Sequence, residues 1–577
     1  MNAPNASGWR PSMGEAGEAK FATSSGDYGL MLEEALSFEL GSADKCGVDI
    51  DEPSRAPAAG LSKFLRKSTP ALPGLTEPET VRHYTRLSRQ NYAIDLGPFP
   101  LGSCTMKHNP RLNEKMARLP GFADVHPMQP QTTVQGALEV IEQLADWLIT
   151  LTGMASVAMS PKAGAHGELC GLLCIRAALD ARGETRDVVL VPESAHGTNP
   201  ATAAFAGFKV ESIPATPAGR VDVAALKAKL GPNVAGVMIT NPNTCGLFEP
   251  DMREIADAVH AAGGYVYCDG ANFNAIVGKV RPGDLGVDAM HINLHKTFST
   301  PHGGGGPGAG PVVLSEALAP FAPLPFVTRG ADGSIHLVEE ENAAEGHAQA
   351  FGRMVAFHGQ MGMFTRALTY ILSHGADGLR TVAEDAVLNA NYVLRSCEDL
   401  LPAPFADSGP CMHEALFSDA GLAEGFSTLD IAKGLIDEGF HPMTVYFPLV
   451  VKGAMLVEPT ETESKAGLDR FIASLRSLAE RAKAGDESLH SAPHFAPRRR
   501  LDETLAARKP VLVWQGEPGI PGTPSLSEIG EADAYGGRWT RPRHVSAAGD
   551  FRWHHGAAHD ADEEGPAAAP SLCGSCR

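Results

Sequence analysis

The sequence lacks long apolar runs. No uninterrupted apolar stretch in its 577 residues reaches the roughly 18 residues that a helix needs to cross a bilayer. The first thirty residues also lack a basic segment followed by an apolar one, which is the pattern of a secretory signal peptide. We therefore expect a cytoplasmic protein that does not insert into a membrane.

Basic residues are scarce as well. The chain has 48 lysines and arginines against 68 aspartates and glutamates, a formal net charge of −20. Proteins that bind nucleic acids usually present a basic surface to the phosphates, so nucleic acid is not an expected partner. The 10 cysteines are scattered, mostly in apolar segments, which is typical of reduced thiols rather than of a secreted disulfide framework.

Changes in composition divide the chain into five segments. They are residues 1–60, 61–131, 132–347, 348–514 and 515–577. The first is rich in Ala, Gly, Ser and Pro and is expected to be a partly disordered arm with one helix near residues 28–40. The third and fourth read as a large and a smaller α/β domain. The last is polar without hydrophobic periodicity and is expected to be a disordered tail.

The large α/β segment alternates short apolar strands with helices. The six predicted strands are 187–192, 208–214, 234–240, 264–269, 288–294 and 310–315. Strands that are apolar on both faces and alternate with helices are typical of a mostly parallel sheet covered on both sides. Such sheets bind ligands at the carboxyl ends of their strands, so the residues that follow these strands are the candidates for chemistry.

Two charged residues stand at such strand ends. Asp269 ends one predicted strand, and Lys296 comes just after another, 27 positions later. A buried carboxylate needs a cation or hydrogen-bond donors, and a lysine among apolar neighbours can become nucleophilic. A simple ion pair between the two is the plainer interpretation.

A glycine-containing turn at residues 159–171 lies between a short strand and a helix. It places Gly164, Ala165 and His166 at the helix start, where free backbone N–H groups could bind a phosphate. The plainer interpretation is that a tight turn needs glycine. Taken alone, this turn does not decide between the two.

Polar residues follow two more strands. His196 could stack on a flat ring, and Asn241 or Asn243 could bind a phenolic oxygen, although a structural histidine and an Asn-Pro turn explain them equally well. Together the features fit one ligand, pyridoxal 5′-phosphate. Lys296 would hold it as a Schiff base, and Asp269 would keep the ring nitrogen protonated, so that the ring withdraws electrons from a substrate carbanion.

Eight motifs, in order over most of the chain, resemble the glycine dehydrogenase (decarboxylating) family, the P-protein of the glycine cleavage system, in its bacterial two-subunit form. The motifs are PLGSCTMKHNP, HPMQPQTTVQG, AGAHGEL, SAHGTNPA, TNPNTCGLFE, NLHKTFSTPHGGGGPG, GFHPMTVYFPLVVKGAMLVEPTETESK and RRLDETLAARKPVL. The resemblance implies a pyridoxal-phosphate enzyme of fold type I, similar to aspartate aminotransferase, with the cofactor in the large domain 132–347.

The resemblance also assigns roles to individual residues. It implies that Lys296 is the Schiff-base lysine, that Asp269 pairs with the ring nitrogen, and that His196 stacks on the ring. Ala271 would lie under the ring, and His295 and Thr297 flank the lysine as in the family.

The reaction implied is that of glycine dehydrogenase (aminomethyl-transferring). Glycine loses CO₂, and its aminomethyl group passes to the lipoyl arm of the H-protein. Ser103, Thr105 and Lys107 in PLGSCTMKHNP are the candidate donors to the glycine carboxylate, and a dimer interface is the alternative role of this stretch. Cys104 beside a disulfide substrate invites a redox role, but a buried structural cysteine is the favoured interpretation.

The length implies a partner. The single-chain P-protein resembles two related halves, and this chain corresponds to the half with the lysine, so a subunit 1 is expected, with two copies of each subunit. The alternatives are another fold type I enzyme, such as an aminotransferase or amino-acid decarboxylase, and a non-catalytic docking subunit. No metal site is predicted, because Cys573 and Cys576 in the tail supply only two thiolates.

Overall fold

The computed structural model describes residues 34–42, 45–48, 64, 72–126, 128–303, 308–339, 349–496, 500–510 and 512. These residues belong to one compact unit of the chain. The predictions for the tail 515–577 and for most of the arm fall outside them. Within the described ranges, no helix combines the length and the hydropathy that a bilayer crossing requires.

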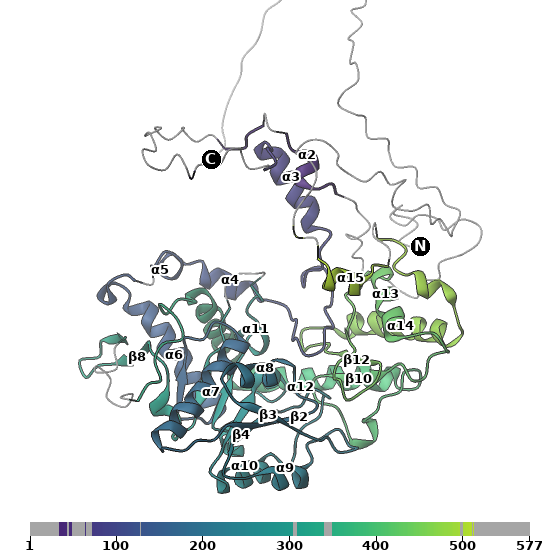
Figure 1. Ribbon diagram of the computed structural model, residues 1–577. Coiled ribbons are helices and arrows are strands. Elements are labelled where there is room, and N and C mark those ends of the chain that lie inside the picture. The colour runs from purple at the N-terminus through teal and green to yellow at the C-terminus, as the bar shows by residue number, and fades with distance from the viewer. Residues whose placement is uncertain are drawn as a thin grey trace, which may run out of the picture. The chain divides into compact units, whose positions relative to one another are not determined.

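A seven-stranded sheet forms the centre of the large domain (Figure 1). Its strands are β1 (Ser156–Ala158), β2 (Val188–Pro192), β3 (Lys209–Ile213), β4 (Val234–Thr240), β5 (Tyr265–Asp269), β6 (Ala289–His291) and β7 (Val312–Leu314). The spatial order is β1-β7-β6-β5-β4-β2-β3, and only β7 runs antiparallel to its neighbours. The six predicted strands and the mostly parallel sheet are therefore confirmed.

Apolar residues alternate between the two faces of this sheet, and each face has its own core. In β5, Val266 and Cys268 join the core that includes helix α6, whereas Tyr265 and Tyr267 join the core that includes helix α7. The covering helices are α6 (Gln135–Thr152), α7 (Gly164–Ala181), α8 (Thr198–Phe205), α9 (Val223–Lys229) and α10 (Met252–Ala261). Burial on both faces explains why the strands read as continuous apolar runs.

The C-terminal part builds a second, smaller core around a three-stranded antiparallel sheet. Its elements are β10 (Ala415–Ser418), α13 (Thr428–Asp437), β11 (Thr444–Val445), β12 (Ala454–Val457) and α14 (Lys465–Lys483). The long helix α12 (Met361–Cys397) leads into it and bends at Gly375, whose φ of 64° few other residues adopt.

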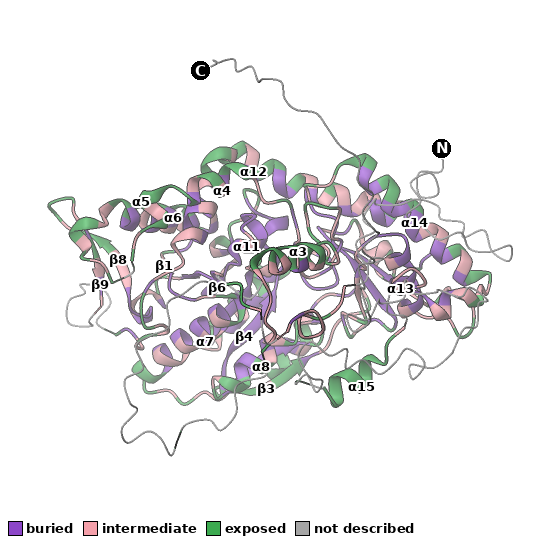
Figure 2. Ribbon diagram, turned by 90° about the horizontal axis from the view of Figure 1, so that it is seen from above, coloured by how far each residue is buried: buried purple, intermediate pink, exposed green. Residues whose placement is uncertain are grey.

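Shorter elements complete the described chain. The helices are α2 (Ser37–Leu40), α3 (Glu77–Ser88), α4 (Arg111–Ala117), α5 (Pro120–Ala123), α11 (Leu294–Thr297) and α15 (Glu503–Arg508). The 3₁₀ turns are η3 (Gln131–Thr133), η4 (Gly270–Ala275), η5 (Pro282–Leu285), η6 (Ala319–Phe321), η8 (Ala406–Ser408) and η9 (Glu487–Ser491). Strand β8 (Phe326–Arg329) pairs with β9 (Ile335–Val338). Helix α3, which the sequence did not predict, is mostly exposed (Figure 2). The domain boundaries remain predictions.

Candidate active site

The residues expected from the sequence meet at the carboxyl edge of the large sheet. Asp269 is the last residue of β5, and Lys296 lies in the single-turn helix α11 that follows β6. Both side chains are buried, with relative exposures of 3% and 9%. Because β5 and β6 are parallel, their carboxyl ends lie side by side, and this places the carboxylate and the ammonium in one site.

Asp269 is held by donors on several sides. Its Oδ2 accepts a hydrogen bond from Asn199 Nδ2 at 2.9 Å, its Oδ1 accepts one from the Ala271 N–H at 2.9 Å, and His291 Nε2 lies 3.4 Å from Oδ1. Burial alone would raise the pKa of Asp269, but His291, Asn199, the Ala271 N–H and Lys296 together lower it. The carboxylate therefore stays ionised, as a partner of a protonated ring nitrogen must.

The network that braces Asp269 contains residues that sequence reasoning missed. Tyr267 Oη lies 2.6 Å from His291 Nδ1, and Asn293 Oδ1 lies 2.9 Å from His291 Nε2. Glu168 accepts hydrogen bonds from Asn199 at 3.2 Å and from Thr198 at 2.8 Å. A histidine ending an apolar strand was the available signal for His291, since β6 is otherwise apolar.

Lys296 contacts the PLGSCTMKHNP stretch through the backbone. Its Nζ donates a hydrogen bond to the carbonyl oxygen of Ser103 at 2.9 Å. Ser103 has a left-handed φ of 62°, which is uncommon for a residue other than glycine and fixes the direction of this carbonyl. The stretch therefore belongs to the site, although its contact with the lysine is a main-chain one.

His196, which the sequence predicted to stack on a ring, lies between β2 and α8. The side chain is exposed, and its Nδ1 is held by Thr198 Oγ1 at 2.9 Å. Phe447, from the loop between β11 and β12, approaches the imidazole edge with ring centroids 5.6 Å apart. The large sheet's domain, which contains His196, and the smaller C-terminal part, which contains Phe447, therefore meet beside this imidazole.

The start of α7 presents backbone N–H groups where the sequence predicted a phosphate site. Ala163 precedes the helix in an extended conformation without a side-chain cap, so the N–H groups of Gly164, Ala165 and His166 have no partner within the helix. His166 Nδ1 accepts a hydrogen bond from the backbone N–H of Lys162 at 3.1 Å. Burial, and then Lys162, lower the pKa of His166.

The two asparagines after β4 are engaged within their own turn. Asn241 Oδ1 accepts a hydrogen bond from the Glu249 N–H at 3.0 Å. Asn243 Oδ1 accepts from the Cys245 N–H at 2.9 Å, and its Nδ2 donates to Glu249 Oε1 at 2.7 Å. These contacts fit the turn role that the sequence left open, and a bond to a phenolic oxygen stays a prediction.

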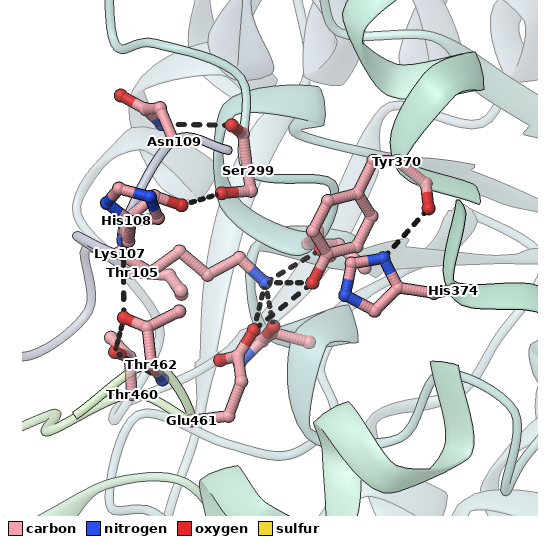
Figure 3. A network of polar contacts seen from close by, with 12 residues as sticks. Thr105, Lys107, His108, Asn109, Ser299, Tyr370, His374, Thr460, Glu461 and Thr462 are labelled. Atoms are coloured by element: carbon pink, nitrogen blue, oxygen red, sulfur yellow. Dashed lines mark hydrogen bonds and ion pairs between the residues drawn. The ribbon is translucent and has the colours of Figure 1, made fainter. Parts of the chain in front are cut away.

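Lys107 and Thr105 are turned toward other protein groups (Figure 3). The acceptors around Lys107 Nζ are Asn274 Oδ1 at 3.0 Å, the Thr297 carbonyl at 2.9 Å, Tyr370 Oη at 3.3 Å and Glu461 Oε1 at 2.5 Å. Burial alone would lower the pKa of Lys107, but Glu461 and Tyr370 raise it. The hydroxyl of Thr105 donates to Glu458. A role of Lys107 and Thr105 as donors to the substrate stays a prediction, and it would require these hydrogen bonds to break.

The neighbours of the lysine are a neutral histidine and a buried hydroxyl. Burial, and then His302 and Lys296, lower the pKa of His295 to about 3. Thr297 is fully buried, and its Oγ1 has no hydrogen-bond partner among the described residues. An open hydroxyl beside the lysine leaves a donor for a ligand.

Cys104 is half-buried rather than fully buried. Burial raises the pKa of its thiol, Lys296 opposes this shift, and Glu458 and Glu414 add to it. A thiol that keeps its proton is a poor nucleophile, in line with the structural role that the sequence favoured.

A cavity of about 450 Å³ opens on the other side of the Lys107 network. Tyr370, His374, Glu461 and Thr462 are among its lining residues, and Tyr370 and Glu461 also contact the Lys107 ammonium (Figure 3). None of the residues predicted to hold the cofactor lines this cavity. It is therefore distinct from the site around Lys296.

The arrangement fits pyridoxal 5′-phosphate. Four features lie at the carboxyl edge of the large sheet. They are a buried lysine, an ionised carboxylate braced by Asn199 and His291, an exposed imidazole, and a helix start with free N–H groups. An aldehyde, a basic ring nitrogen, a flat ring and a phosphate are the chemical groups that these features would bind.

Comparison with known proteins decides the family. A probable glycine dehydrogenase (decarboxylating) subunit 2 from Caulobacter vibrioides is 67% identical over 503 residues, which are 86% of this chain and 95% of that protein. Another from Listeria welshimeri is 49% identical over 497 residues, 85% of this chain and 100% of that protein. The chain belongs to the glycine dehydrogenase (decarboxylating) subunit 2 family. The resemblance seen in the sequence is confirmed.

Family models agree with this membership, and solved structures share the fold. The model of the glycine dehydrogenase C-terminal domain matches residues 382–494, and that of aminotransferase class-V matches residues 170–318. An inhibitor-bound glycine decarboxylase (P-protein) of the glycine cleavage system aligns with a TM-score of 0.61 at 23% identity, over 73% of this chain and 94% of that one. A sphingosine-1-phosphate lyase from Burkholderia pseudomallei aligns at 0.55 and 14%, over 74% of this chain and 96% of that one. They share the fold, which confirms the predicted α/β class.

Proposed function

We propose that this subunit decarboxylates glycine with pyridoxal 5′-phosphate and passes the aminomethyl group to the lipoyl arm of an H-protein. The observation that carries the proposal is the buried pair of Lys296 and Asp269 at one strand edge, in a chain that belongs to the glycine dehydrogenase (decarboxylating) subunit 2 family. A non-catalytic docking subunit would need neither residue.

Each residue of the site has a role toward the cofactor. Lys296 Nζ would bind its carbonyl carbon, and the open N–H groups at the start of α7 would hold its phosphate. His196 and Ala271 would contact its ring, and Asp269 would keep a proton on the ring nitrogen. The bound cofactor supplies an electron sink for the bond that breaks in the substrate.

The charges around the site support these roles. His291, Asn199 and the Ala271 N–H stabilise Asp269 as an anion, so that it can keep a proton on its partner instead of taking it. His295 stays uncharged beside the lysine, because burial lowers its pKa to about 3. His295 therefore adds no positive charge beside Lys296.

The partners follow from the family. The name subunit 2, shared by the relatives, implies a subunit 1. We infer an assembly with two copies of each subunit in the cytoplasm, in which a lipoylated H-protein delivers the acceptor disulfide. Ser103 is the member of PLGSCTMKHNP that reaches Lys296, so this loop is our candidate for the wall against which glycine and the lipoyl arm meet.

Exchange of carboxyl groups between glycine and labelled bicarbonate tests the proposal. We expect exchange when the chain, subunit 1 and lipoylated H-protein are combined, and little exchange from the chain alone, even though it binds the cofactor. Exchange at the same rate with and without H-protein would point to another pyridoxal-phosphate decarboxylase. Full activity without subunit 1 would reject the two-subunit arrangement.

A further inference from the structure

Two buried carboxyl groups from the smaller domain lie beside Lys296. Glu414 directly precedes β10, and Glu458 directly follows β12. These strands are antiparallel with Ala415 opposite Val457, so the two glutamates are neighbours across the end of the sheet. Their relative exposures are 0% and 1%, and one side-chain atom of each lies within 4.8 Å of the other and of a nitrogen of His413.

The contacts of these carboxyl groups lead to the loop that holds Lys296. Glu414 Oε1 accepts a hydrogen bond from the Ser103 N–H, and the Ser103 carbonyl accepts one from Lys296 Nζ at 2.9 Å. Glu458 Oε1 accepts from the hydroxyl of Thr105 in the same loop. Ser103 thus connects Glu414 to the lysine through its two peptide groups, and Glu458 is bonded to the same loop at Thr105.

The second oxygen of each carboxyl group is open. Neither Glu414 Oε2 nor Glu458 Oε2 has a hydrogen-bond partner among the described residues, and the same holds for both ring nitrogens of His413. Buried polar atoms of this kind are rare unless a proton, a water molecule or a ligand satisfies them. A proton between the two carboxyl groups would do so without any further group.

The charge balance also requires a proton. The charged groups that face the pair are Lys296 and Glu461, and the ammonium of Lys107 is bound by Glu461. One lysine cannot offset two buried carboxylates, which repel each other at this separation. His413 adds no positive charge, because burial and then Lys296 lower its pKa to about 3. Cys104 adds no negative charge, because burial raises the pKa of its thiol.

The pKa directions agree with this geometry. Burial raises the pKa of Glu414 to about 7. Burial, and then Glu414, raise the pKa of Glu458 well above its usual range. Two interacting carboxyl groups that titrate apart in this way hold one proton over the intermediate pH range.

We propose that Glu414 and Glu458 share one proton and form the proton store of Lys296. When an amino acid replaces Lys296 at the cofactor's carbonyl carbon, one C–N bond forms, another breaks, and no electrons leave the site. The incoming ammonium must lose two protons, and the departing Nζ gains two as it becomes an ammonium. The pair passes them on one at a time, accepting each from the first nitrogen and returning one to the second, so its own proton count is unchanged. This exchange rests on the proposed function, whereas the shared proton does not.

Infrared difference spectroscopy of the full-length holoenzyme tests the shared proton. At mildly alkaline pH we expect the carbonyl band of a protonated, buried carboxyl group, and its loss in both Glu414→Gln and Glu458→Gln, where the remaining glutamate ionises. Glu463→Gln is the matched control, because burial also raises the pKa of Glu463 to about 7 but it has no contact with Lys296. The control keeps the band. No such band in the wild-type chain would overturn the proposal, whether or not the variants fold.

A second readout reports the coupling to Lys296. In the double variant Glu414→Gln/Glu458→Gln, the negative charge beside the lysine is gone. The pH midpoint at which the lysine-bound cofactor changes its absorbance should therefore fall by about one unit, the scale expected for a lost neighbouring charge. An unchanged midpoint would contradict the coupling.

Neither readout uses glycine or H-protein. A chain with the band but without carboxyl exchange would reject the proposed function and keep the proton store. A chain with exchange but without the band would reject the proton store and keep the function.

Discussion

At the scale of single residues, burial decides which histidines can carry charge. His358 has a relative exposure of 4%, its ring lies beside Phe364 with centroids 5.7 Å apart, and neither nitrogen has a hydrogen-bond partner within the described ranges. Burial, and then Lys162, lower the pKa of His358 to about 4. Protonation of this ring is therefore coupled to unfolding.

The sign of that coupling follows from the two pKa values. Between about 6.5 and about 4 the unfolded chain binds a proton at His358 that the folded chain does not bind. This contribution to stability is complete above pH 6.5 and is lost as the pH falls toward 4, by on the order of 3 kcal/mol. His358→Phe should therefore lose less unfolding free energy than the wild type over this window, as measured by chemical denaturation at both ends.

The exposed His336 supplies the control for this experiment. His336→Phe removes an exposed histidine and leaves His358 in place. This variant should therefore lose as much unfolding free energy in acid as the wild type does. An acid dependence of His358→Phe equal to that of the wild type would contradict the burial account.

The same scale shows what sequence could and could not predict about the site. Lys296 and Asp269 were recognisable because Asp269 ends an apolar strand and Lys296 follows another. The partners of Lys107 were not, since Tyr370 and Glu461 are 263 and 354 positions away in the chain. Polar side chains compete for partners in three dimensions, and a local pattern does not show which contact wins.

At the scale of elements, the start of α7 depends on a residue without a side chain. A Cβ at Gly164 would lie 2.5 Å from Asn293 Nδ2 and 3.2 Å from His291 Nε2. Asn293 cannot move freely, because its Oδ1 is bonded to the histidine that braces Asp269. The helix start and the strand end therefore fit together only with glycine at this position.

Gly164→Ala should weaken cofactor binding by about tenfold, or about 1.4 kcal/mol, since it displaces the start of α7 and the Asp269 network together. Titration of the apoprotein with pyridoxal phosphate, followed by absorbance, measures this. Gly136→Ala in α6 is the control, because a Cβ there meets nothing within 4 Å, and it should leave the affinity unchanged. Equal affinities of the two variants would contradict the role given to Gly164.

The elements themselves were predictable where burial imposes a period. Every expected strand of the large sheet is present. Helices bury both faces of its central strands, whereas the edge strand β3 is largely exposed. Helix α3 was missed, since it is largely exposed and has little apolar pattern, although Thr76 and Glu79 form a capping box at its start. Strand β10 was missed because its four residues are too short to show a period.

At the scale of the whole molecule, the site is assembled from distant parts of the chain. Ser103 comes from the N-terminal segment, Asp269 and Lys296 from the large sheet, and Glu414 and Glu458 from the smaller one. Family resemblance located most of these motifs, but only the folded chain places the carboxyl pair beside the lysine.

The proposed function depends on a covalent link between Lys296 and the cofactor. Borohydride reduction of the holoprotein fixes the lysine-bound cofactor, and peptide mass spectrometry then identifies the modified residue. We expect a single modified peptide, the one that contains Lys296. A label on Lys107 or Lys162, or no label on any lysine, would contradict this link.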